Sequence, residues 1–184
     1  MQRKSIKKSG FSLIEVMVVL TIAGILLGVG LPSFKDFMAN SKMAETHNIL
    51  VHSIQLARST SVQRLEATGL CVSNAPMLDN AVCTIGSSYN NGWLVYVDSD
   101  GDGLRGAAED IVERVDAPGA AFTFAPSTLF ENQIYFNDSG ASITVAGVPI
   151  SGTIGIDYAN GVQQRLITVS ANGRVKSETP TSAP

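Results

Sequence analysis

The stretch FSLIEVMVVLTIAGILLGVGL, from Phe11 to Leu31, carries a single charged side chain, Glu15. An α-helix rises about 1.5 Å per residue, so a helix of this length covers about 30 Å, the thickness of the hydrocarbon core of a bilayer. We therefore expect residues 11–31 to form a membrane-spanning helix. The run is longer than the apolar region of a cleavable secretory signal and ends in Leu31-Pro32 instead of a small-x-small site, so any cut is expected before it.

The charges of the chain are distributed unevenly about this run. Arg3, Lys4, Lys7 and Lys8 precede it without an acid, which by the positive-inside bias predicts a cytoplasmic N-terminus and a remainder outside the inner membrane. Beyond the first ten residues, nine Lys and Arg accompany sixteen Asp and Glu, a net charge of −7. General binding to nucleic acid depends on phosphate neutralisation by cations, so such a chain is expected to contact DNA only through a local patch.

Glu15 lies among apolar residues, where a carboxylate costs about 2.5 to 3.5 kcal/mol on insertion scales and is usually paired and functional. The residues KKSGFSLIE, from Lys7 to Glu15, resemble the prepilin leader of type IV pilins and type II secretion pseudopilins. The resemblance implies that residues 1–10 are a leader, that prepilin peptidase cuts between Gly10 and Phe11, and that Phe11 is N-methylated.

Cleavage at this position has a physical consequence for assembly. It would create an α-ammonium at Phe11, which Glu15 of a neighbouring subunit could neutralise in the low-dielectric core of a filament. The alternative is a lone signal-anchor helix that holds Glu15 near the cytoplasmic interface as a protonated or solvated acid. The filament interpretation predicts other major and minor pilins as partners of the N-terminal helix, with the inner membrane as its location before assembly.

The helical pattern continues beyond the apolar run. Gly24, Gly28, Gly30 and Pro32 predict a kink or a locally melted turn, because Gly and Pro weaken a helix. An apolar face then returns, which predicts one helix from Phe11 to about Arg64 whose part in residues 32–68 is an amphipathic stalk. This face comprises Leu50, Val51, Ile54, Ala57, Val62 and Leu65. His47 and His52 lie five residues apart, which does not suit a metal pair on one helix face.

After residue 68 the pattern changes to short β-branched and aromatic runs separated by Gly, Asn, Asp and Pro. These runs predict antiparallel sheets packed on the helix, an α+β protein with a β-rich head at residues 69–178 and a disordered tail at 179–184. The expected strands are Leu70–Ser73, Ala81–Ile85, Trp93–Val97, Ile111–Val115, Ala121–Phe124, Gln133–Phe136, Ser142–Val145, Thr153–Tyr158, Gln164–Ser170 and Arg174–Ser177.

Cys71 and Cys83 are the only cysteines, and the expected topology places both outside the cytoplasm. An even pair in an oxidising compartment favours a disulfide over two buried thiols.

The head also carries a resemblance. LARSTSVQR (Leu56–Arg64), NGWLVYVD (Asn91–Asp98) and VSANGRV (Val169–Val175) are similar to the GspH/FimT group of minor pilins and pseudopilins. The resemblance implies a type IV pilin-like fold and a low-abundance subunit that primes filament assembly and sits near the tip. A pilus subunit and a type II secretion pseudopilin both fit it.

Two motifs in the head suggest ligands. Asp98, Asp100, Asp102 and Glu109 match the D-x-D-x-D-G-x5-E pattern of a calcium loop, in which alternate carboxylates converge on one cation. A strand is expected to lead into the loop, unlike an EF-hand, and the alternative is an Asp- and Gly-rich hairpin tip with solvated charges.

The second motif lies near the C-terminus. Some FimT-like pilins bind DNA through a basic C-terminal motif, which Arg174 and Lys176 match in outline, with Arg165 on the preceding strand. The alternative is an ordinary exposed strand. Both histidines lie on the expected helix, and the chain has no nucleophile pair, zinc spacing or phosphate-binding glycine loop. We therefore expect a non-enzymatic filament subunit without a cofactor, calcium excepted.

Overall fold

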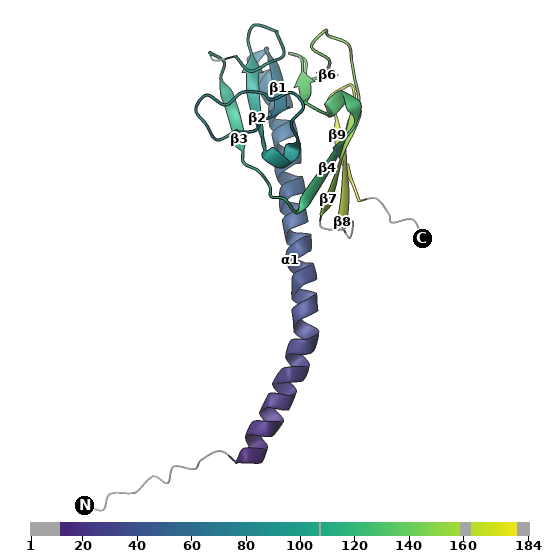
Figure 1. Ribbon diagram of the computed structural model, residues 1–184. Helices are drawn as coiled ribbons and strands as arrows, with labels where there is room; N and C mark the ends of the chain where they lie inside the picture. The colour runs from purple at the N-terminus through teal and green to yellow at the C-terminus, as the bar shows by residue number, and fades with distance from the viewer. Residues whose placement is uncertain (1–11, 107, 159–162, 180–184) are drawn as a thin grey trace, which may run out of the picture. The chain divides into compact units, whose positions relative to one another are not determined.

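The computed structural model describes residues 12–106, 108–158 and 163–179. The chain forms two compact units, residues 1–41 and residues 42–184, and each is considered by itself. Helix α1 (Leu13–Arg64) begins in the first unit and ends in the second (Figure 1). The predicted end at Arg64 is confirmed, whereas the predicted melted turn is wrong, because the helix assignment passes through Gly24, Gly28 and Pro32 without a break. Each glycine costs a helix only about 1 kcal/mol, and one Pro removes one backbone hydrogen bond.

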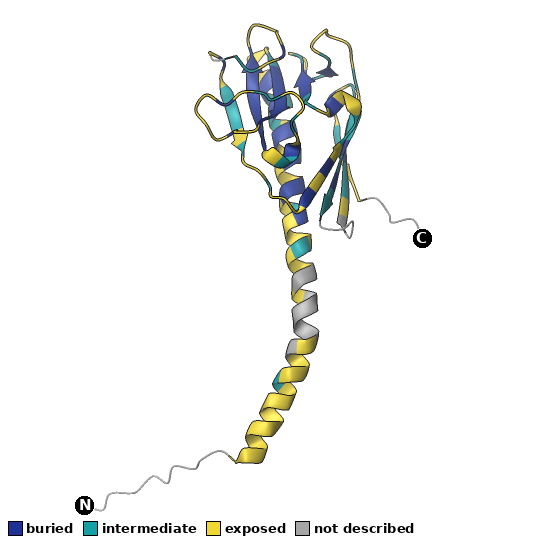
Figure 2. Cartoon of the chain, viewed as in Figure 1, coloured by how far each residue is buried: buried dark blue, intermediate teal, exposed yellow. Residues whose placement is uncertain are grey.

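The described part of the first unit consists of α1 alone, and its large apolar side chains are exposed (Figure 2). In the ranges that the structure describes, no helix has the combination of length and apolar character that crossing a membrane requires. The exposed side chains at the start of the helix are Leu13, Ile14, Val16, Met17, Val18, Val19, Leu20, Ile22, Ile25 and Leu26.

The second unit, which we call the head, contains the end of α1 and two antiparallel sheets. Sheet A has the strand order β3-β2-β1-β5-β6, and sheet B has the order β4-β7-β8-β9. The strands of sheet A are β1 (Ala67–Val72), β2 (Trp93–Asp98), β3 (Ile111–Val115), β5 (Gln133–Phe136) and β6 (Ser142–Ile143). Those of sheet B are β4 (Phe122–Pro126), β7 (Gly152–Tyr158), β8 (Gln163–Val169) and β9 (Val175–Glu178). The short 3-10 helices η1 (Tyr89–Asn91) and η2 (Thr128–Phe130) lie in the connections.

One hydrophobic core joins α1 to both sheets. Leu50, Ile54 and Ala57 of the helix are fully buried, as their spacing predicted, and they belong to one cluster with side chains of sheets A and B. The predicted face extends too far, because Val62 and Leu65 are 46% and 74% exposed. Both residues lie at the C-terminal end of α1, beyond the helix residues that pack in the core.

Strand β2 is buried on both faces. Trp93 and Val95 belong to the large core with the helix, whereas Leu94 and Tyr96 belong to a second cluster on the outer face of sheet A. Successive side chains of a strand point to opposite faces, which produces this division. The Trp93 indole N–H donates to the Ser53 hydroxyl over 3.0 Å, so the largest buried side chain is satisfied by the helix on which it packs.

Nine of the ten predicted strands are present, two of them with the predicted bounds. The strand expected at Ala81–Ile85 is wrong, since these residues form no ladder. Strand β1 already pairs with β2 on one edge and with β5 on the other, so it has no free edge for them. The apolar pattern of this segment has a different cause: Ala81 and Cys83 cover the outer face of sheet A.

The predicted disulfide is confirmed. Cys71 in β1 is bonded to Cys83, with Cα atoms 5.5 Å apart, and this bond holds the segment of residues 73–88, which we call the disulfide loop, against sheet A. The Thr84 amide also donates to the Val72 carbonyl over 2.9 Å. The disulfide and several hydrogen bonds, among them one from the Gly86 amide to the Asn132 side chain over 2.8 Å, thus fix a loop that belongs to no sheet.

Replacing both cysteines by serine should lower the free energy of unfolding by about 3 kcal/mol, because the bridge limits the freedom of the unfolded chain. Chemical unfolding of the full chain in detergent, compared with the Cys71→Ser, Cys83→Ser variant, measures the loss. Mass spectrometry with an alkylating reagent provides the control, and two thiols that react before any reductant is added would contradict the bridge.

Candidate functional site

The four residues of the predicted calcium loop lie together at the end of β2. Asp98 closes the strand, Asp100 and Asp102 follow in the turn, and Glu109 precedes β3; we call residues 98–110 the acid loop. Carboxylate oxygens of Asp98, Asp100 and Asp102 lie within 4.8 Å of one another. Three of the four predicted ligands therefore lie close together, whereas Glu109 does not belong to this group among the described residues, and calcium binding stays a prediction.

The buried carboxylate of Asp98 accepts hydrogen bonds from the loop itself. Its side chain is 3% exposed, and it accepts from the amide of Gly101 over 2.7 Å and from the amide of Gly103 over 2.8 Å. The Tyr135 hydroxyl of β5 donates to the same carboxylate. Gly101 and Gly103 both have a φ of 78°, a left-handed conformation that glycine adopts without strain. The predicted turn glycines thus serve to bring backbone N–H groups to Asp98.

Glu109 acts in the same way from the other end of the loop. It is 7% exposed, and it accepts from the Ser99 amide over 2.8 Å and from the Gly106 amide over 2.6 Å. Both of its oxygens are therefore used by the backbone. The two buried acids of the pattern hold the loop in shape through charge-assisted hydrogen bonds, which are stronger than neutral ones.

These contacts determine the ionisation of the site. Burial alone would raise the pKa of Asp98, but the hydrogen bonds from Tyr135, Gly103 and Gly101 outweigh it and hold that pKa below its usual value. Burial, followed by the hydrogen bond to Asp98, raises the pKa of Tyr135. Asp98 is thus an ionised carboxylate, and Tyr135 is a neutral donor, across the ordinary pH range.

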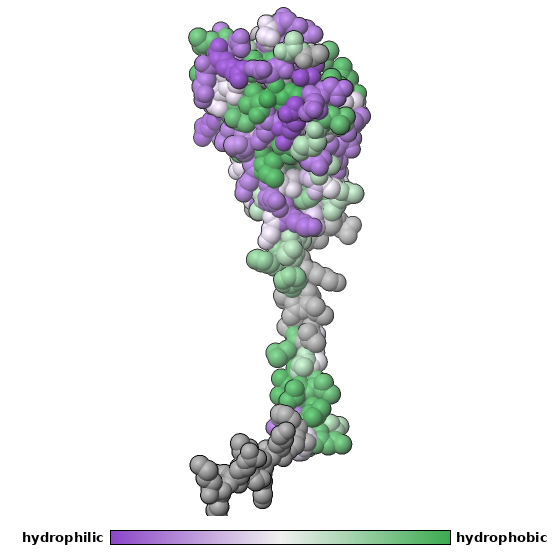
Figure 3. Space-filling model, turned by 90° about the vertical axis from the view of Figure 1, so that its left-hand side faces the viewer, coloured by the Kyte–Doolittle hydropathy of each residue, from purple (hydrophilic) through white to green (hydrophobic). Residues whose placement is uncertain are grey.

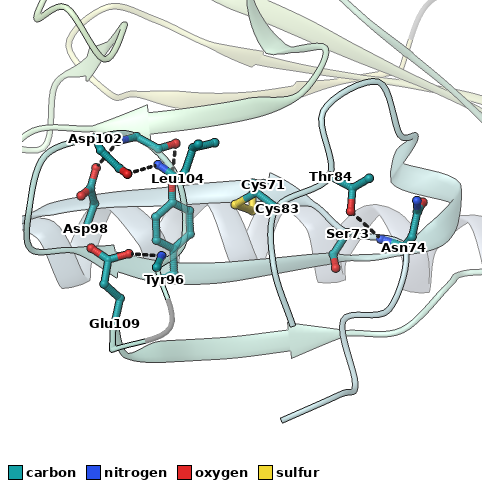
Figure 4. The surroundings of a disulfide bond; sticks show 12 residues. Cys71, Ser73, Asn74, Cys83, Thr84, Tyr96, Asp98, Asp102, Leu104 and Glu109 are labelled. Carbon is teal, nitrogen blue, oxygen red and sulfur yellow. Dashed lines mark hydrogen bonds between the residues drawn. A yellow bond between two sulfur atoms is a disulfide. The ribbon is translucent and has the colours of Figure 1, made fainter. Parts of the chain in front are cut away.

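The acid loop is also tied to sheet A by Tyr96, whose hydroxyl donates to the Gly103 carbonyl over 2.8 Å. Tyr96 pairs with Gly69 across β1 and β2, and a β-carbon on Gly69 would come within 2.5 Å of the Tyr96 ring. The missing side chain at residue 69 therefore leaves room for the tyrosine. Figure 4 shows the disulfide between the acid loop, at Asp102 and Leu104, and the disulfide loop, at Asn74 and Thr84.

The three cations of the predicted DNA site do not form one patch. In the register of β8 and β9, Lys176 lies opposite Thr168, whereas Arg165 is aligned with the buried residues Ile167 and Val169 on the other face of the sheet. The Arg165 guanidinium donates to Thr179. Arg174 lies in the turn before β9 and is exposed. Arg174 and Lys176 are therefore exposed, whereas Arg165 is half-buried and lies on the other face of the sheet from Lys176.

Arg58 contributes a contact that the sequence pattern did not indicate. Its guanidinium donates to the Gly140 carbonyl over 3.0 Å and to the Asn172 carbonyl over 3.1 Å, so the helix holds two turns that are distant in sequence. Arg58 and Arg174 line one groove of about 460 Å³. Helical periodicity marks Arg58 only as a residue off the apolar face, and no local signal shows that it lies beside Arg174.

His47, to which the sequence assigned no chemistry, has a structural contact. It is 8% exposed, and its Nε2 lies 2.6 Å from the Ser177 hydroxyl of β9. His52 lies 3.7 Å from the Glu113 carboxylate of β3. The two histidines therefore contact different sheets.

The processing site lies outside the described residues, since Gly10 and Phe11 both fall there. Glu15 is described: it is exposed in the first turns of α1 among exposed apolar side chains. Residues 180–184 of the predicted disordered tail also lie outside the described ranges, whereas Thr179 contacts Arg165.

The acid loop predicts a pH dependence of stability. Because the pKa of Asp98 is lowered on folding, its contribution is complete above the unfolded value of about 3.9 and is lost as the pH falls through the lower folded value. The variant Tyr135→Phe should therefore be less stable than the parent at pH 7, and this difference should shrink in acid. Urea unfolding at pH 7 and pH 3, with a chelator present, measures it.

Tyr158→Phe, on sheet B, is the matched control for that experiment. It should show the same stability difference from the parent at both pH values. A Tyr135→Phe effect that does not change with pH would show that its hydroxyl does not stabilise the charged form of Asp98.

Comparison with known proteins adds family information to this geometry. The family model for the type II transport protein GspH matches residues 48–173, and the model for the prokaryotic N-terminal methylation motif matches residues 6–31. The fimbrial protein EcpC of Eikenella corrodens is 46% identical over 46 residues, which cover 25% of this chain and 29% of that protein. A fimbrial protein of Dichelobacter nodosus is 32% identical over 108 residues, 58% of this chain and 62% of the relative. The chain thus spans less than two thirds of the length of these relatives.

Solved structures confirm the fold. The type IV minor pilin FimU of Pseudomonas aeruginosa is 20% identical with a TM-score of 0.54, over 82% of this chain and 95% of that one. The minor pseudopilin EpsH of Vibrio cholerae is 10% identical with a TM-score of 0.52, over 76% and 98% of the two chains. The helix packed on antiparallel sheets is therefore the type IV pilin-like fold, as predicted. The match over residues 48–173, preceded by the methylation motif, shows that the chain belongs to the GspH family of minor pilins and pseudopilins.

Proposed function

We propose that this protein is a minor subunit of a type IV pilus, which primes assembly of the filament and sits near its tip. The observation that carries the proposal is the order of the two matches on one chain, with the N-terminal methylation motif at residues 6–31 before a GspH head at residues 48–173. The alternative is the equivalent subunit of a type II secretion pseudopilus. The role is structural in either case, and the chemistry is performed on this chain by prepilin peptidase.

In this proposal, the leader of residues 1–10 is removed on the cytoplasmic side and Phe11 is methylated. The chain waits in the inner membrane with its head outside the cytoplasm. The exposed apolar side chains at the start of α1 support this, because lipid or the helices of other pilins must cover so large an apolar surface.

Glu15 then directs assembly. It is exposed in the first turns of α1 beside Leu13, Ile14 and Val16 in the chain, which are each at least 48% exposed. Transfer of these side chains into a filament core leaves the carboxylate without water, and the new α-ammonium of a neighbouring subunit supplies the opposite charge. The pair therefore favours insertion of a processed subunit over an unprocessed one.

The variant Glu15→Val should be processed and inserted normally, but its amount in sheared filaments should fall at least tenfold, since the neighbour's ammonium would remain unpaired. Immunoblots of the membrane and filament fractions measure both quantities. Thr21→Val is the matched control, because the Thr21 hydroxyl donates only within its own helix, to the Met17 carbonyl. If the Glu15→Val variant enters filaments as well as the parent does, the proposed charge pair between Glu15 and the neighbour's ammonium is wrong.

Priming and tip location are tested by deletion and labelling. Cells that lack the protein should carry far fewer pili of ordinary length, because initiation fails while elongation does not. Gold-labelled antibody against the head should decorate filament ends. Normal pilus numbers in the deletion strain together with lost secretion would favour the pseudopilus, and label distributed along the shafts would remove the tip location.

A second function, DNA capture at the tip, is favoured by one observation: Arg174 shares a groove with Arg58, and Lys176 follows two residues later. These cations could contact the phosphates of one DNA segment. Because Arg165 lies on the other face of the sheet, we assign it no role in this binding. Few phosphate contacts predict a weak affinity that falls steeply with salt.

The double variant Arg174→Gln, Lys176→Gln should weaken DNA binding in a gel shift at least fivefold, and it should lower the salt dependence, because each lost phosphate contact reduces the slope by about 0.9. Arg114→Gln, an exposed arginine on sheet A, is the matched control. Equal losses in both variants would show that only total charge matters.

Calcium binding by Asp98, Asp100 and Asp102 stays a proposal, supported by the closeness of their oxygens. Asp98 and Glu109 already accept backbone hydrogen bonds, so an ion must use their remaining lone pairs together with the exposed Asp100 and Asp102. The urea experiment at pH 7, repeated with millimolar calcium in place of the chelator, tests it. An unchanged midpoint would remove the proposal, because an ion that binds only the folded chain must stabilise it.

A further inference from the structure

The head has a hollow of about 240 Å³ beside the disulfide. Three apolar side chains from separate segments line it: Ile85 of the disulfide loop, Leu104 of the acid loop and Leu129 of η2. They are 71%, 43% and 54% exposed. The disulfide itself forms part of the lining, so this is a covalently fixed surface.

The fold does not require these side chains to be apolar. The second cluster on the outer face of sheet A is completed by Cys71, Ala81, Leu94 and Tyr96, with Cys83 and Ile111 against it, and the three residues of the hollow lie outside that cluster. The disulfide loop also exposes Met77, Leu78 and Val82. Such concentrated apolar exposure marks an interaction surface. Figure 3 shows a side of the head on which apolar surface is enclosed by hydrophilic surface.

The segments that contribute to the hollow carry more acids than cations. Residues 65–164 contain twelve Asp and Glu but only two cations, Arg105 and Arg114. Three exposed acids lie on the segments that line the hollow: Asp79 in the disulfide loop, Asp102, whose carboxylate accepts from the Leu104 amide over 2.7 Å, and Glu131, two residues after Leu129. Arg105, the one cation on these segments, donates to the Glu109 carbonyl.

We propose that this hollow is the docking site for another protein, which inserts one apolar side chain flanked by Lys or Arg. Apolar contact supplies the anchor and charge complementarity selects the partner. The size fits one large apolar side chain. A cavity of about 150 Å³ holds a benzene ring, and the hollow has about 240 Å³. This surface belongs to the head alone, so it adds a contact to those made by the N-terminal helix.

Site-specific photocrosslinking of the full chain in its native cells tests the proposal. Benzoylphenylalanine replaces Leu129, and in a matched strain it replaces Val62, an exposed apolar residue on α1 that does not line the hollow. After illumination, the adduct is digested and the crosslinked partner peptide is sequenced by mass spectrometry. We expect at least fivefold more adduct from position 129, joined to a segment with an apolar residue within two positions of Lys or Arg.

Charge and shape are then tested separately. Glu131→Gln and Leu104→Ser should each reduce the adduct from position 129 at least threefold, whereas Asp157→Asn on sheet B should leave it unchanged. Alkylation confirms in each variant that the Cys71–Cys83 bond is formed, so a loss of adduct is not a loss of the fold. Equal adduct at positions 129 and 62, or a crosslinked segment without cations, would overturn the proposal.

Discussion

The packing of the last turns of α1 against two sheets is the constraint on which the rest of the head depends. Met43, Leu50, Ile54 and Ala57 are fully buried, and they form one cluster with residues from both sheets. Sheets A and B share no ladder hydrogen bonds among the described strands, so they are joined by side chains: Trp93 contacts Phe124 directly, and the helix side chains pack in the same cluster. The Trp93–Ser53 hydrogen bond joins the helix to β2, and Arg58 joins it to the turns at Gly140 and Asn172. The acid loop and the disulfide loop are therefore held on a head whose two sheets and helix share one large core.

Local sequence patterns predicted most of the helix and strand positions, because residue spacing and residue type within one segment determine them. The bounds of β3 and β5 follow from β-branched and aromatic runs, and the buried face of α1 follows from the spacing of Leu50, Ile54 and Ala57. The failure at Ala81–Ile85 has a nonlocal cause, since both edges of β1 were already taken by strands far along the chain. A segment that packs across the face of a sheet has the same alternating apolar pattern as a strand within the sheet, so the sequence does not distinguish the two.

The candidate sites likewise include features that local spacing predicts and features that depend on residues distant in sequence. The convergence of Asp98, Asp100 and Asp102 was predictable from their alternate spacing. Their hydrogen bonding was not, because the Tyr135 donor comes from β5, thirty-seven residues away. The separation of Arg165 from Lys176 depends on the register of β8 and β9, and the number of cations in the sequence does not reveal this register. The groove of Arg58 and Arg174 joins residues more than a hundred positions apart.

The core of the head includes side chains of α1, which limits how the chain can be truncated. An N-terminal truncation that extends past Ile54 removes helix side chains that belong to the core, and it leaves the Trp93 indole without the Ser53 hydroxyl. A fragment that contains the intact head must therefore keep residues from about Lys42 onward, so that the helix side chains still pack in its core. The same dependence means that the last turns of α1 cannot leave the head without exposing its hydrophobic core to water.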